Sequence, residues 1–316
     1  MRLSVPVTLL ALVLSIGAAA QSAATWTRGA AMPAGRSEIA AAALDGRIYV
    51  AGGMHPLGAT AAFTAYRPAA DEWQKLAPLP EAVHHLALAA ADGRIYATGG
   101  YASFTFSADI RAAWAYDAAA NQWSRIADMP GPRAAHAMAA IGGKVYVVCG
   151  TGPEPRALWV YDPGTDRWRA DRAPLPTPRE HLAAIALGGK LYVIGGRGHG
   201  QGNRATVEVY DPETDSWTQR VSMANPRGGF AAAAVGARIH VTGGEAFDPY
   251  ETFDSHEIYD PAADRWTPGP PLPTARHGLA SAGLGGRWYV IGGATKAAMM
   301  TLVSLSDLVE IYTPGP

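Results

Sequence analysis

A residue pair that ends in glycine and closes an apolar run recurs six times along the 316-residue chain. The pairs are Gly52-Gly53, Gly99-Gly100, Cys149-Gly150, Gly195-Gly196, Gly243-Gly244 and Gly292-Gly293, and successive pairs are 47, 50, 46, 48 and 49 residues apart. A period of this length indicates an array of supersecondary units. Because one such unit cannot bury its apolar face alone, the units must pack against one another.

Each period predicts four short antiparallel strands. Turn formers such as Asp45-Gly46 lie between two apolar runs ahead of each glycine pair, a strong hairpin signal. After five of the pairs, a tyrosine precedes a tryptophan by seven residues, with Asp, Pro or other turn-forming residues between them. These aromatic pairs are Tyr66 and Trp73, Tyr116 and Trp123, Tyr161 and Trp168, Tyr210 and Trp217, and Tyr259 and Trp266.

The first strand of each unit is rich in alanine, as in residues 40–43, 87–91 and 231–234. Small side chains suit strands that converge on an axis, whereas the recurring Tyr and Trp suit outer strands that pack between neighbouring sheets. The sequence therefore predicts an all-β fold, a six-bladed β-propeller with four antiparallel strands per blade.

The two chain ends are predicted to share the last blade. Tyr312 has no tryptophan seven residues later, and Trp26 has no preceding unit of its own. A strand near residues 25–29 is expected to pair with the strand that contains Tyr312, which closes the ring and removes the exposed sheet edges.

These motifs resemble the kelch-repeat family, whose marks are a Gly-Gly pair ending the second strand, a Tyr in the third and a Trp in the fourth. The resemblance covers essentially all of residues 21–316. It implies a kelch β-propeller but no single function, because kelch propellers include enzymes, adaptors and cytoskeletal binders.

Residues 1–20 are typical of a signal peptide, with a positively charged Arg2, an apolar stretch and the A-x-A cleavage motif Ala18-Ala19-Ala20. Cleavage is expected after Ala20, leaving residues 21–316 as a periplasmic or extracellular propeller without a membrane anchor. The formal net charge of −1 argues against nucleic acid as a partner. Cys149 is the only cysteine, so no intramolecular disulfide forms.

Loops from the fourth strand to the next first strand, and from the second to the third, lie on one face of a propeller. An arginine begins five of the innermost strands, and histidines lie close by. The predicted ligand-binding set is Arg36, His85, Arg133, His136, Arg179, His181, Arg227, Arg276 and His277. Guanidinium groups at a channel mouth bind carboxylates. The alternative is architectural, with the repeated arginine serving each blade equally and bonding neighbouring loop carbonyls. No histidine shows zinc-type spacing, so neither a metal nor a cofactor is expected.

Glu245, directly behind Gly243-Gly244, is the candidate catalytic acid or base. Gly244-Glu245-Ala246 resembles the G-E-A segment of periplasmic sialic acid mutarotases, although Glu251 stands where their proposed catalytic arginine lies. Galactose oxidase resembles the chain as a kelch propeller, but no Cys and Tyr occupy its copper-site positions. Plant specifier proteins carry an E-x3-D-x3-H iron site, and here Asp248, Thr252 and His256 lack its middle carboxylate.

Two functions follow from these residues. The first is an exported binding module that engages a protein partner or a small anionic ligand or carbohydrate at the channel mouth. The second is a cofactor-independent sugar mutarotase or isomerase. We expect the position of Glu245 to distinguish them, since a mutarotase needs this carboxylate in the channel mouth within reach of an arginine.

Overall fold

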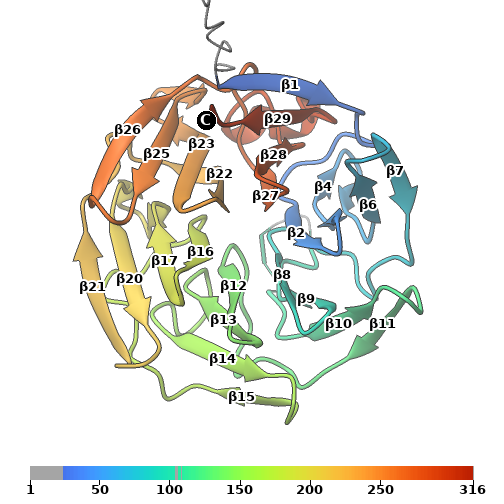
Figure 1. Ribbon diagram of the computed structural model, residues 1–316. Helices are drawn as coiled ribbons and strands as arrows, with labels where there is room; N and C mark the ends of the chain where they lie inside the picture. The colour runs from blue at the N-terminus through green and yellow to red at the C-terminus, as the bar shows by residue number, and fades with distance from the viewer. Residues whose placement is uncertain (1–23, 104–105, 108, 316) are drawn as a thin grey trace, which may run out of the picture.

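The computed structural model describes residues 24–103, 106–107 and 109–315, and they form a disc of six antiparallel sheets around a central axis, each with four main strands (Figure 1). The predicted six-bladed propeller is confirmed. The predicted signal peptide lies outside the described residues.

The first three blades follow one another along the chain, each running from the axis to the rim. Blade 1 contains β2 (Ala40–Leu44), β3 (Arg47–Ala51), β6 (Phe63–Arg67) and β7 (Glu72–Lys75). Blade 2 contains β8 (Ala87–Ala91), β9 (Arg94–Thr98), β10 (Ala113–Asp117) and β11 (Gln122–Arg125). Blade 3 contains β12 (Ala137–Ile141), β13 (Lys144–Val148), β14 (Leu158–Asp162) and β15 (Arg167–Arg169).

The remaining blades repeat this order. Blade 4 contains β16 (Ala183–Leu187), β17 (Lys190–Ile194), β20 (Val207–Asp211) and β21 (Ser216–Arg220). Blade 5 contains β22 (Gly228–Val235), β23 (Arg238–Phe247), β25 (His256–Asp260) and β26 (Arg265–Gly269). Blade 6 contains β27 (Ala280–Leu284), β28 (Arg287–Ile291), β29 (Val309–Thr313) and β1 (Thr25–Gly29).

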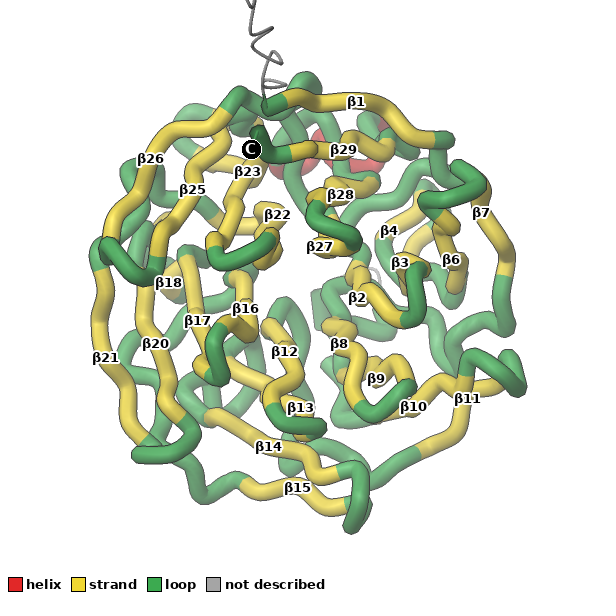
Figure 2. Tube along the Cα trace, in the orientation of Figure 1, coloured by secondary structure: helices red, strands yellow, loops and turns green. Residues whose placement is uncertain are grey.

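Short extra elements occupy the loops between the second and third strands of the blades. They are β4 (Met54–His55) with β5 (Gly58–Ala59), β18 (Arg197–Gly198) with β19 (Gly202–Asn203), β24 (Tyr250–Thr252) beside β23, and the 3₁₀-helix η1 (Ala298–Val303). Figure 2 shows η1 in red behind the last blade. In the part of the chain that the structure describes, no helix is long and apolar enough to cross a membrane.

The N-terminal strand closes the ring as predicted. β1 pairs antiparallel with β29, with Trp26 opposite Tyr312, and Figure 1 shows the blue strand beside the red one. The Trp26 ring lies 5.2 Å from Tyr312 and 5.8 Å from Trp288, centroid to centroid. Aromatic packing and five residue pairs thus join the two chain ends in one sheet.

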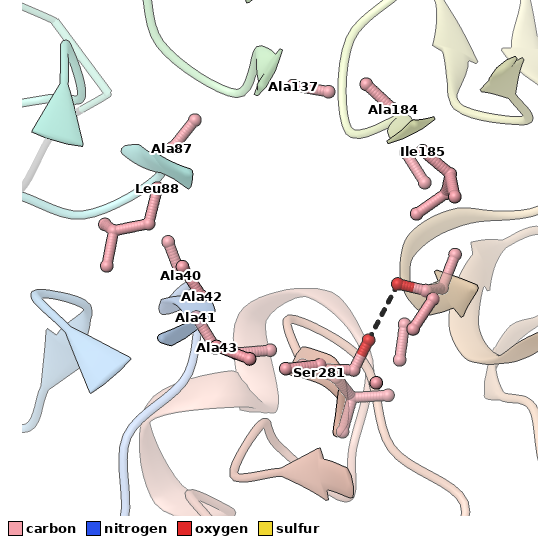
Figure 3. Close-up of a pocket in the computed structure, with 18 of the residues that line it drawn as sticks. Ala40, Ala41, Ala42, Ala43, Ala87, Leu88, Ala137, Ala184, Ile185 and Ser281 are labelled. Atoms are coloured by element: carbon pink, nitrogen blue, oxygen red, sulfur yellow. Dashed lines mark hydrogen bonds between the residues drawn. The ribbon is translucent and has the colours of Figure 1, made fainter. Parts of the chain in front are cut away.

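The alanine-rich strands β2, β8, β12, β16, β22 and β27 line the central channel, as Figure 3 shows for Ala40–Ala43 and their neighbours. The channel cavity measures about 420 Å³. Crowding is severe where blades 5 and 6 meet, because a Cβ on Gly283 would lie 2.2 Å from the carbonyl oxygen of Ala234. Only small residues therefore fit where the innermost strands of these two blades meet.

The recurring Tyr and Trp residues take part in hydrogen bonds that connect each blade to the preceding one. In blade 4 the indole of Trp217 donates to the carbonyl of Ala173, while Asp215 accepts from the backbone N–H of Ala173 and from the Tyr210 hydroxyl. Blades 1, 3 and 5 repeat this bridge with Asp71, Asp166 and Asp264, and blade 2 uses Asn121. The repeated aromatic spacing thus reflects an inter-blade clamp.

We expect Asp215→Ala to lower the free energy of unfolding by about 1 kcal/mol at pH 7, because two donors lose their acceptor at a partly exposed site. Hydrogen bonds from the clamp tyrosines hold the pKa values of Asp71, Asp215 and Asp264 below 3.8. Their stabilisation is therefore complete above the unfolded-state pKa and is lost as the pH falls through the lower folded-state values. Urea unfolding between pH 2 and 7 measures it.

Asp215→Asn is the matched control, since blade 2 already carries Asn121 at this position. We expect this variant to cost less than Asp215→Ala at pH 7 and to show a shallower loss of stability below about pH 4. Equal acid sensitivity of wild type and Asp215→Asn would contradict a contribution from the Asp215 charge.

Candidate functional site

Six backbone hydrogen bonds close a ring around the axis at the start of the innermost strands. The N–H groups of Glu38, His85, Ala135, His181, Gly229 and Gly278 each donate to the carbonyl of the preceding member, at 2.7–3.1 Å. All six residues have φ between 48° and 65°. This left-handed conformation is costly for residues other than glycine. The hydrogen bonds of the ring stabilise it and thereby hold the non-glycine members, such as Glu38, His85 and His181, at the channel mouth.

A pocket of about 540 Å³ lies over this ring, on the face that carries the second-to-third-strand loops. Glu38, His85, His181 and His277 line it, together with Glu180 and with Arg197 from β18 and Glu245 from β23. Its apolar and aromatic wall includes Tyr101, Phe106, Phe247, Tyr250, Met299 and Leu302. The pocket therefore combines buried charged groups with an apolar and aromatic wall.

Glu245 lies in this pocket and is almost fully buried, with 4% of its side chain exposed. Its Oε1 accepts from Nη2 of Arg197 at 2.5 Å and lies 3.1 Å from Nδ1 of His277, and its Oε2 accepts from the backbone N–H of Ala298 at 2.8 Å. Burial alone would raise the pKa of Glu245, but His277, Arg197 and the Ala298 N–H outweigh it and lower that pKa below 4.5. Glu245 is therefore a carboxylate at neutral pH.

His277 forms the other half of this pair. Its Nε2 lies 3.1 Å from the carbonyl oxygen of Lys296, so this nitrogen carries a proton. Burial lowers the pKa of His277, but the hydrogen bond and charge of Glu245, with Glu38, reverse the effect and raise it above 6.5. Glu245 and His277 are thus a carboxylate and an imidazole that favours its charged form, within proton-transfer distance.

Glu38, His85 and His181 converge on the axis from blades 1, 2 and 4. Oε2 of Glu38 lies 3.2 Å from Nε2 of His85 and 3.9 Å from Nε2 of His181. Burial, tempered by His277 and Arg197, raises the pKa of Glu38 to about 7. Burial and neighbouring cations lower the pKa values of His85 and His181 well below 6.5, so both imidazoles are neutral at physiological pH.

The five predicted arginines do not line this pocket. They are at most 2% exposed, and their guanidinium groups bond within their own blades. Three of them pair with glutamates: Arg179 with Glu208, Arg227 with Glu257 and Arg276 with Glu310. Arg36 donates to the Gly52 and Ala62 carbonyls. Arg133 donates to two carbonyls, and its guanidinium lies 3.6 Å from the Trp159 ring centroid. Partners on the third strands and adjoining loops hold these cations away from the mouth, as the architectural alternative expects.

The predicted histidines divide between two levels. His85, His181 and His277 line the pocket, whereas His136 faces the channel cavity and bonds to Oγ1 of Thr98 at 2.8 Å. Burial lowers the pKa of His136 to about 3, which makes it a neutral hydrogen-bonded residue.

Arg197 and Glu38 are site residues that the sequence analysis did not select. Arg197 directly follows Gly195-Gly196, the register that Glu245 occupies after Gly243-Gly244 one blade later. Glu38 occupies the same ring register as His85 and His181. Comparing equivalent positions across the blades would have found both, because equivalent positions meet at the axis. The same comparison reveals Glu208, Glu257 and Glu310, each two residues before a third-strand tyrosine.

Among the described residues, seven of the eight exposed large apolar side chains belong to the loops around this pocket. They are Leu57, Phe106, Phe247, Tyr250, Met299, Met300 and Val303. Single exposed apolar residues are ordinary, but their concentration on one face marks a surface for ligand or partner contact.

The fold and the pocket define the class: a six-bladed propeller of the kelch type whose loop-bearing face carries a buried polar site. A model of the KLHDC2/KLHL20/DRC7 Kelch-repeats domain matches residues 127–293, more than half of the chain, and the Kelch motif matches residues 35–80 and 82–130. The chain belongs to the kelch-repeat family. No curated protein sequence matches it significantly.

A solved structure described as "Structure of YjhT" superposes with a TM-score of 0.76 over 88% of this chain and 95% of that one. The sequences are 16% identical over this match, which supports the shared propeller fold and nothing finer.

Proposed function

We propose that this protein binds a small hydroxylated ligand of the carbohydrate class, with sugar acids as the first candidates, in the pocket at the channel mouth. This proposal rests on the pocket of about 540 Å³, which combines buried charged groups with an aromatic wall. Ligand sites are typically concave, mainly apolar and furnished with a few fixed polar groups.

Arg197 is the proposed anchor for a ligand carboxylate. One Nη of its guanidinium bonds to Glu245, whereas the other lies 4.0 Å from Glu180, beyond hydrogen-bonding distance. The side chain is 10% exposed. Because one Nη is engaged by Glu245, the other is the group that can donate to a planar anion such as a carboxylate.

The aromatic wall suits the apolar faces of a sugar ring. Phe247 and Tyr250 are 46% and 71% exposed although they line the pocket, and Arg197 lies 4.5 Å from the Phe247 ring centroid. The cation thereby fixes the orientation of one wall ring. Aromatic faces supply contact area at low conformational cost.

A second candidate, sugar mutarotation, is favoured by one observation: Glu245 lies in the channel mouth at 2.5 Å from an arginine. That arginine comes from blade 4 and not from the position after Glu245 where sialic acid mutarotases carry theirs. In this proposal Glu245 accepts the anomeric hydroxyl proton and then donates it to the ring oxygen, while His277 and Arg197 stabilise its carboxylate form.

A thermal-shift screen of residues 21–316 with sialic, uronic and other sugar acids tests the binding proposal. A ligand at 100 times its Kd is expected to stabilise the protein by about 2.7 kcal/mol. Arg197→Met is expected to weaken binding at least tenfold, since a charge-assisted contact is lost. Arg204→Met, directly after β19 and outside the pocket lining, is the matched control. No shift with any sugar acid would favour a protein partner on the exposed apolar face.

We also propose that the protein is exported and acts in the periplasm or outside the cell. Arg2 and the apolar residues that follow support this proposal. Mass spectrometry of the exported form is expected to find Gln21 at the N-terminus, and retention of residues 1–20 would contradict it.

A further inference from the structure

The Glu38, His85 and His181 cluster places two imidazoles and one carboxylate against each other on the propeller axis. Their nearest side-chain nitrogen and oxygen atoms all lie within 4.8 Å of one another. The exposed fractions of the side chains are 10%, 2% and 12%. Their backbones are held by the hydrogen-bonded ring at the channel mouth, so three strands from three blades preorganise the cluster.

Hydrogen bonds behind His85 determine which of its nitrogens faces the axis without a proton. Nε2 of His84 lies 3.0 Å from the carbonyl oxygen of Ser103, so it donates, and Nδ1 of the same ring is then an acceptor. Nδ1 of His85 lies 2.5 Å from this Nδ1 and must donate to it. Nε2 of His85 therefore presents a lone pair to Glu38.

His181 reaches the same state by a separate contact. Its Nδ1 lies against the carboxylate of Glu180. Because a carboxylate only accepts, this contact favours the tautomer with the proton on Nδ1, which leaves the lone pair of Nε2 towards Glu38. A carboxylate or another acceptor behind a histidine is the usual outer partner of a metal-bound imidazole. When Glu38 is ionised, three acceptor atoms thus converge on one point of the axis.

We propose that Oε2 of Glu38, Nε2 of His85 and Nε2 of His181 bind one divalent transition-metal ion, with the remaining coordination positions open to the pocket. Two imidazoles and one carboxylate suit Zn²⁺, Fe²⁺, Co²⁺ or Ni²⁺, whereas Mg²⁺ and Ca²⁺ prefer an all-oxygen set. Tetrahedral binding at usual metal–ligand distances separates ligand atoms by about 3.3 Å. The 3.2 Å separation of Glu38 and His85 already fits, and rotation of the side chains closes the remaining gaps.

Sequence spacing concealed this site because the three ligands lie 47 and 96 residues apart, in different blades. Metal-site motifs are recognised when two ligands lie within a few residues on one element. Here the equivalent position of several blades supplies one ligand each.

Metal binding to the full mature chain, with no organic ligand present, tests this inference independently of the carbohydrate proposal. Protein stripped with a chelator is titrated with Zn²⁺ or Co²⁺ by calorimetry and by visible Co²⁺ absorption. We expect one equivalent per chain and at least a 100-fold preference over Mg²⁺. Absence of stoichiometric binding of either ion would overturn the proposal.

Glu38→Gln and His181→Ala are each expected to lower Zn²⁺ affinity at least 100-fold. Glu180→Gln, which removes only the charge behind His181, is expected to lower it 10- to 100-fold. His199→Ala, at an exposed position in the β18–β19 hairpin, is the control and leaves the affinity unchanged. Melting of each metal-free variant checks its fold, and a folded triad variant that retains wild-type affinity would overturn the assignment.

Discussion

Arg276→Ala is expected to lower the free energy of unfolding by about 3–5 kcal/mol at neutral pH. Arg276 and Glu310 are both 0% exposed in their side chains and lie 2.6 Å apart. The substitution leaves a buried carboxylate without its cation and removes the Nε donor that the Gly292 carbonyl accepts at 2.8 Å. Urea unfolding followed by circular dichroism measures the loss.

Two further variants separate the buried pair from general effects of charge. Arg276→Met combined with Glu310→Leu removes both charges and is expected to recover most of the lost stability, because an apolar pair needs no desolvation of ions. Arg238→Ala breaks a pair whose side chains are 59% and 31% exposed, at 3.8 Å, and is expected to cost less than about 1 kcal/mol. If Arg276→Ala were as mild as Arg238→Ala, the architectural role of the arginine repeat would be contradicted.

Glu245→Gln is expected to slow anomeric exchange of the preferred sugar about 10²- to 10⁴-fold, the usual loss when a general acid or base is removed. Glutamine is nearly isosteric and keeps a carbonyl acceptor for Arg197, but it cannot take up a proton at neutral pH. NMR exchange spectroscopy between the two anomers measures this rate. The prediction depends on the mutarotation proposal.

Glu251→Gln is the matched control for that experiment. Glu251 belongs to the same loop, pairs with Ala246 across β23 and β24, and lies outside the pocket lining. It is expected to leave the exchange rate unchanged. Equal rates for wild type and Glu245→Gln would contradict proton transfer by Glu245 and leave carbohydrate binding as the function of the pocket.

The fold was predictable because its determinants are local and repeated. Glycine pairs, hairpin turns and the seven-residue Tyr–Trp spacing each lie within one blade, and the unmatched Trp26 and Tyr312 indicate closure. The clamp partners of these aromatics were not predictable in detail, since Trp217 and Ala173 are 44 residues apart.

The site was predictable only in part. The loop-face assignment placed Glu245, His85, His181 and His277 at the channel mouth, and the pocket contains all four. The direction of the strand-start arginines was not predictable from their own positions, because it depends on buried partners such as Glu310. Arg197 was missed since its partner Glu245 belongs to the next blade.

By itself the amino-acid sequence determined the number of blades, their strand order and the sharing of the last blade, because short-range turn chemistry and apolar periodicity specify them. Only the tertiary structure decided which side chains meet at the axis and which cations are neutralised inside the blades. Radial closure brings together residues from separate repeats, and burial then selects the partners that they must find.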